Sequence, residues 1–292
     1  MAGTPENLGQ SDTIARARAS ARHSRPKWPE MTRAVSGSLA KLEASPLGAL
    51  RMSALDSPLL QATLRDELRA AWLTLQEKHG QDGLYGFGVY TTPSASYLMV
   101  TAFSEKGLDE AVAQYVADFS EGGRAADVRQ TMLAQGGTPD DPALWRRALR
   151  WSPCDSPLHE VGSPLLPQSD RIIHELDLAG RWADDDEMDD DEFDEACEAP
   201  DPELDELFRV IVLVLQGLDR EGLFGTGAAR ERLVLSVWQG DQSDRSRYGF
   251  AKSLNPPGVT QRFGREMNDE AQADDKLWNR RGKQRSKPEV FE

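Results

Sequence analysis

The sequence is poor in cysteine and in long apolar runs. It contains two cysteines in 292 residues, Cys154 and Cys197, and no C-x-x-C pair, which disfavours a disulfide framework and a structural zinc site. The longest apolar run, Val210 to Leu215, is far shorter than the ~20 residues that span a bilayer. The first residues are basic but lack the apolar segment of a secretory signal. We therefore expect a cytoplasmic protein with no membrane partner.

Histidine is also scarce, which limits the catalytic chemistry that the sequence supports. Of the four histidines, His159 and His174 precede glutamates, but neither pair continues into the H-E-x-x-H pattern of a metalloprotease. Ser156, Asp155 and His159 lie close in sequence without the strand–turn–helix pattern that surrounds a hydrolase nucleophile. Hydrolysis by paired carboxylates stays open, because acids are plentiful. We expect no cofactor and no bound metal, and the sequence assigns no catalytic residue.

Negative charge is concentrated in one tract. The formal net charge is −15, and residues 184–206 hold 15 acids with no Lys or Arg. Since the chain has 49 acids and 34 bases, the remainder holds 34 of each. Both ends are basic, and residues 276–287 carry six bases with no acid. The body between them is mildly acidic, so nucleic-acid binding by the folded body is disfavoured.

The acidic tract permits three interpretations. Its start matches positions 1, 3 and 12 of an EF-hand loop, but Met188 and Asp189 stand where that loop needs an oxygen ligand and a glycine. A solvated, disordered insertion whose like charges repel is the simplest interpretation. The third is a surface for a basic protein partner, with Asp185, Asp190 and Phe193 as its contact residues.

Hydrophobic spacing predicts amphipathic helices and strands along the middle of the chain. A helix should begin at Ser57-Pro58, a favourable N-cap and first-turn pair. It carries an apolar stripe of Leu60, Leu64, Leu68, Trp72 and Leu75. Aromatic and β-branched residues predict a hairpin over 87–92 and 97–103. A second helix over 204–218 and a strand over 233–238 repeat this order, with further helices predicted over 108–119, 127–134, 141–149 and 169–178.

These elements predict a single α+β domain over residues 55–268, with a mainly antiparallel sheet packed by amphipathic helices. The acidic insertion at 184–206 interrupts this domain. Residues 1–54 are rich in Ala, Ser, Arg and Pro, which predicts a disordered basic arm, although an Arg-rich start is also typical of an organelle transit peptide. Residues 269–292 form a basic tail that we expect to be disordered.

Two glycine-rich segments resemble each other, DGLYGFG at 82–88 and EGLFGTG at 221–227. Each follows a predicted helix and precedes a predicted strand, which suggests an internal helix–turn–strand pseudo-repeat. Glycine suits a helix end because it adopts the left-handed conformation at no steric cost. Phosphate-binding loops of the Walker and Rossmann types need the opposite order, a strand before the glycines and a helix after them. We interpret both segments as joints between a helix and the sheet.

Several motifs resemble those of a bacterial family, the domain of unknown function 4303 family. They are Tyr85-Gly-Phe-Gly-Val-Tyr-Thr91, Trp151-Ser152, Leu218 to Gly225 and Ala251 to Pro257, and the resemblance spans about 55–267. Residues 102–103 and 156–157 depart from the family pattern. The resemblance implies an α+β fold and an association with toxin and immunity loci, but no established activity or catalytic residue.

Two functional hypotheses follow. The first is a non-catalytic protein-binding module, immunity-like, that takes a basic partner such as a toxin. The second is a hydrolase-type enzyme with a site near loops at 151–160 and 250–257, formed by Trp151, Asp155, Lys252 and Asn255. The two prolines after Asn255 lack backbone donors, which predicts an exposed, stiff loop there.

Overall fold

The computed structural model describes residues 58–93, 95, 97–159, 166–175, 202–240 and 242–279. These residues belong to one compact unit, Leu50–Glu292. The predicted basic arm and the predicted contact residues Asp185, Asp190 and Phe193 lie outside the described residues.

A three-stranded sheet organises the described residues. Strand β1 (Leu84–Thr91) lies between β2 (Leu98–Ser104) and β3 (Val234–Gln239). β1 and β2 pair antiparallel with Phe87 opposite Ala102, whereas β1 and β3 pair parallel with Phe87 beside Leu235. The predicted α+β class is confirmed. The predicted mainly antiparallel sheet is approximately right, since one of these two pairings is antiparallel and the other parallel.

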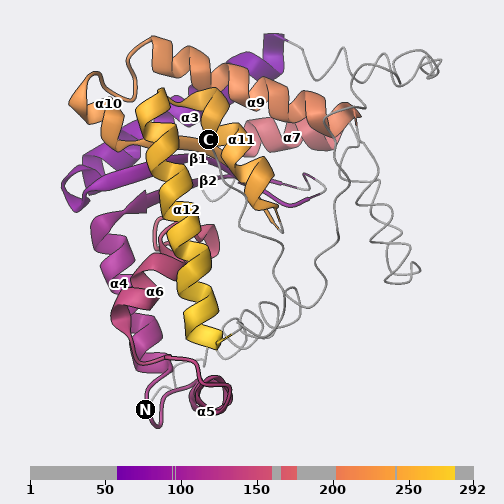
Figure 1. Ribbon diagram of the computed structural model, residues 1–292. Coiled ribbons are helices and arrows are strands. Elements are labelled where there is room, and N and C mark those ends of the chain that lie inside the picture. The colour runs from indigo at the N-terminus through magenta and orange to yellow at the C-terminus, as the bar shows by residue number, and fades with distance from the viewer. Residues whose placement is uncertain are drawn as a thin grey trace, which may run out of the picture. The chain divides into compact units, whose positions relative to one another are not determined.

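Helices α3 (Pro58–His79), α7 (Pro167–Glu175) and α9 (Pro202–Arg220) pack on one face of the sheet (Figure 1). The stripe predicted for α3 is buried in full. α9 buries an equivalent stripe, which includes Leu207, Val210, Ile211, Leu215 and Leu218. Burial of each such side chain stabilises the fold by about 1.5–3 kcal/mol. The β-branched residues within 210–214 lie in α9, as predicted.

The other face is covered by α4 (Glu105–Asp118), α6 (Pro142–Leu149), α11 (Asp244–Leu254) and α12 (Pro257–Trp278) (Figure 1). Its core is aromatic and includes Phe103, Trp145, Trp151, Trp238 and Phe263. Helix α5 (Ala126–Ala134) contacts α12. The helices predicted over 108–149 are confirmed within a few residues, but α11 and α12 were not predicted. α12 continues to Trp278, past the predicted end of the domain.

A register shift at the start of β1 decides which of its side chains face each core. Tyr85 packs into the core under α4 and α12, whereas Phe87 and Val89 pack into the core under α3 and α9. Because side chains alternate along a strand, and a bulge reverses that alternation once, Gly86 and Gly88 face the α4 and α12 side.

These two strand glycines leave room for aromatic side chains and for a neighbouring backbone. A Cβ atom at Gly86 would lie 2.9 Å from the ring of Trp151. A Cβ atom at Gly88 would lie 1.8 Å from the backbone oxygen of Ser236 and 2.8 Å from the ring of Trp238. The indoles thus lie directly on the backbone of the central strand, a close approach that only glycine allows.

Other glycines of the two repeated segments end helical turns, as predicted. Gly83 has φ 73° after the short helix η1 (Gly80–Asp82), and Gly222 and Gly225 have φ 79° and 88° after α9. Residues other than glycine rarely adopt this left-handed backbone conformation. The second segment passes through the short helix α10 (Ala228–Arg232) before β3, so the two helix–turn–strand units are not identical.

The outer edge of β2 is hydrogen-bonded to the chain that follows α6. The Leu98 N–H donates to Oδ1 of Asp170 at 2.6 Å, and the Leu166 N–H donates to the Leu98 carbonyl at 3.0 Å. Further along, the Ala102 N–H donates to the carbonyl of Leu158 at 3.2 Å. Burial raises the pKa of Asp170, an effect that its bond from Leu98 opposes. These bonds hold Leu158, Leu166 and Asp170 against the edge of the sheet.

Replacement of Gly88 by alanine tests the close approach between β1 and β3. Because the added Cβ meets backbone atoms that cannot rotate away, we expect G88A to lower the free energy of unfolding by about 3 kcal/mol. The measurement is chemical denaturation followed by circular dichroism.

Gly249 provides the matched control, since it lies on the exposed side of α11 with nothing within 4 Å of an added Cβ. We expect G249A to be neutral or to stabilise the protein by up to about 1 kcal/mol. Equal stability of G88A and the wild type would contradict the packing described above.

Candidate functional site

A short helical turn, η2 (Pro153–Asp155), forms the candidate site, and Trp151 fixes its position. The Trp151 side chain is 0% exposed and packs edge-on against Tyr85 and Phe263. Its indole N–H donates to Oε2 of Glu266 at 3.1 Å. Trp151 therefore holds the start of the 151–160 segment from inside the core, and its ring is not exposed to a ligand.

Asp155 connects η2 to helix α4. One carboxylate oxygen accepts a hydrogen bond from the Tyr115 hydroxyl at 2.5 Å, and the other accepts one from the Ser152 hydroxyl. The Ser156 hydroxyl donates to the carbonyl of Ala102 in β2 at 2.6 Å. The turn is thus fixed both to the helix and to the sheet. Hydrogen bonds from two hydroxyls orient the Asp155 carboxylate.

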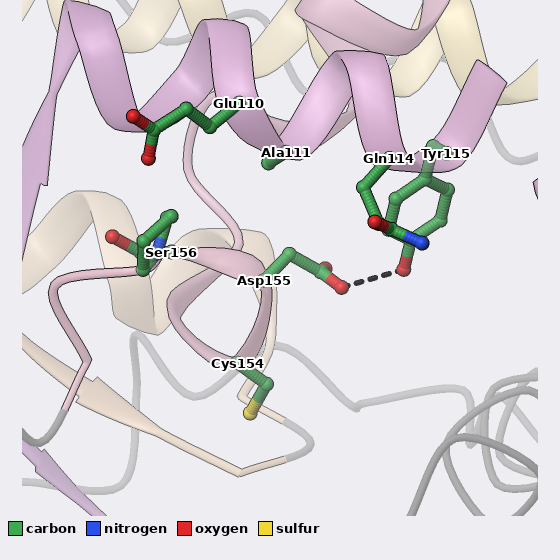
Figure 2. A pocket seen from close by; sticks show the side chains of 8 residues that line it. Glu110, Ala111, Gln114, Tyr115, Cys154, Asp155 and Ser156 are labelled. Carbon is green, nitrogen blue, oxygen red and sulfur yellow. Dashed lines mark hydrogen bonds between the residues drawn. The ribbon is translucent and has the colours of Figure 1, made fainter. Parts of the chain in front are cut away.

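An open pocket of about 330 Å³ lies between α4 and η2 (Figure 2). The helix and the loop contribute four residues each: Glu110, Ala111, Gln114 and Tyr115 from α4, and Cys154, Asp155, Ser156 and Pro157 from η2 and the residues after it. Figure 2 shows the Tyr115 hydroxyl and the Asp155 carboxylate pointing toward each other across the gap. Two of the eight lining residues, Glu110 and Asp155, are acids, and none of the eight is a Lys or Arg.

Partly exposed aromatic rings adjoin this pocket. The Cys154 thiol donates to the hydroxyl of Tyr90, with 3.8 Å between sulfur and oxygen. Tyr90 contacts the ring of His159 edge-on, with 4.9 Å between centroids, and lies 6.4 Å from the ring of Tyr97. All three rings are partly buried. Cys154 of the pocket thus contacts a group of aromatic rings near the end of β1.

Asn255 has a structural position at the outer edge of β3. Its amide Oδ1 accepts from the Leu235 N–H at 2.8 Å, and its Nδ2 donates to the Leu235 carbonyl at 2.7 Å. Nδ2 also donates to the Ala251 carbonyl at 2.7 Å. The side chain thus bonds to the strand as a neighbouring backbone would, which explains the Asn of the Ala251 to Pro257 motif.

The prediction of an exposed, stiff loop at 250–257 is wrong. Lys252 lies on the exposed side of α11, Asn255 follows the last residue of that helix, and Pro256-Pro257 begins α12. Proline suits the first turn of a helix because its missing N–H needs no partner there. Of the four residues of the hydrolase hypothesis, only Asp155 lines the pocket. Trp151 packs in the core, Asn255 bonds to β3, and Lys252 is exposed on α11.

Sequence reasoning missed Arg230, which supports the same edge of β3. It is 6% exposed, and its guanidinium donates to Oδ1 of Asp219 at 2.7 Å and to the Leu233 carbonyl at 2.7 Å. It also donates to Oδ1 of Asn255 at 3.1 Å. Its sequence context resembles an exposed helix, and only the fold shows that it is buried.

Glu110 and Tyr115 of the pocket were also missed as functional candidates. Tyr115 lies within the helix predicted over 108–119, and its bond to Asp155 joins positions 40 residues apart. Within the described residues, no group of three or more His, Cys, Asp or Glu side chains could hold a metal ion. No helix in the same part of the chain combines the length and apolar character needed to cross a membrane.

Alanine substitution of Asn255 tests its structural position. Since N255A leaves the Leu235 N–H and carbonyl without these partners, we expect the free energy of unfolding to fall by about 3 kcal/mol. K252A, at an exposed position three residues away, should change it by less than about 0.5 kcal/mol. Denaturant titration of both variants measures the difference. A stable N255A variant would show that Asn255 does not hold β3.

Comparison with known proteins places the chain in a family without assigning a reaction. A search of curated proteins and a search of solved structures each gave no match. The family model described as Domain of unknown function (DUF4303) matches residues 64–256. This range contains β1, β2, β3, η2 and Asn255, together with the helices α4, α5, α6, α7, α9, α10 and α11. The chain therefore belongs to the domain of unknown function 4303 family.

Proposed function

We propose that this protein is a non-catalytic protein-binding module, immunity-like, that holds a basic protein partner such as a toxin in the bacterial cytoplasm. The observation that carries the proposal is the pocket between α4 and η2. Its lining residues include Glu110 and Asp155 but no Lys or Arg. A protein surface rich in carboxylates attracts a partner of opposite charge and accelerates its association.

The aromatic residues beside the pocket support a protein partner over a small metabolite. Tyrosines contribute large contact areas at low entropic cost, and they are enriched among the residues that dominate binding energy. Tyr90, Tyr97 and Tyr115 lie around η2 and are each partly exposed. Together with the carboxylates they offer a surface that combines apolar contact with charge.

The sheet edges favour binding through side chains over binding by strand addition. Strand addition requires a row of available backbone N–H and carbonyl groups at an edge. At the described positions Leu98 and Ala102 of β2 and Leu235 of β3, these groups already bond within the chain. The acids Asp185 and Asp190, together with the aromatic residue Phe193, stay in the proposal as a second contact region for the same basic partner.

The proposal predicts a salt-sensitive partner that depends on the pocket. The tagged full chain, used to capture proteins from its native host, should retain a basic protein at low salt and lose most of it at moderate salt, because the attraction is screened within ~10 Å at 0.1 M. The E110Q/D155N variant should bind that purified partner about tenfold more weakly, as measured by biolayer interferometry.

E231Q/E175Q is the matched control, since it removes the same two charges at exposed positions of α10 and α7. It should bind the partner like the wild type. Retention of the same affinity by E110Q/D155N, or capture that is insensitive to salt, would contradict the proposed function.

A further inference from the structure

We draw no further inference here: the strongest candidate, the apolar surface that the exposed leucines Leu59 and Leu73 of α3 and Leu213 of α9 form on the outer side of these helices, carries none, because nothing in the described residues shows what covers it.

Discussion

The fold depends on the direct contact between indole rings and the backbone of the central strand. Gly88 lies so close to Ser236 and Trp238 that no side chain fits there, and Gly86 leaves equivalent space for Trp151. Close packing of this kind contributes dispersion attraction over large ring surfaces, and it tolerates little change in volume. The glycines of β1 are therefore part of the core on the α4 and α12 side.

That contact also explains why η2 has a defined position. Trp151 is buried between β1 and α12, and the chain emerges from it directly into Ser152 and η2. Asp155 then bonds to Tyr115, whose ring lies 5.0 Å from that of Trp145 in the same core. The pocket is thus built on packed aromatic residues at both walls. A site held in this way is preorganised, which reduces the entropy lost when a partner binds.

Much of the fold could be predicted from the sequence because its signals are local. The stripe from Leu60 to Leu75 and the antiparallel strand pair predicted over 87–92 and 97–103 follow from spacing and composition, and both are present in the structure. The two prolines after Asn255 were misinterpreted, because the same pair suits a stiff loop and the first turn of a helix. Their context distinguishes the two only once α12 is known to pack against α6 and α11.

The candidate site was less predictable because its residues come from distant parts of the sequence. Asp155 was identified from the loop around it, but the α4 wall formed by Glu110 and Tyr115 lies about 40 residues earlier and has the pattern of an ordinary amphipathic helix. Lys252 and Asn255 were grouped with Asp155 on the assumption of converging loops. The structure instead uses Asn255 at the edge of β3, so sequence proximity to a family motif did not indicate a shared site.

The central claim is that a partner protein contacts this chain at α4 and η2. Hydrogen–deuterium exchange of the full chain, alone and with its purified partner, tests that claim most directly. The account predicts slower exchange in residues 105–118 and 152–158 when the partner is bound. Slower exchange confined to α3 and α9, on the opposite face of the sheet, would contradict it.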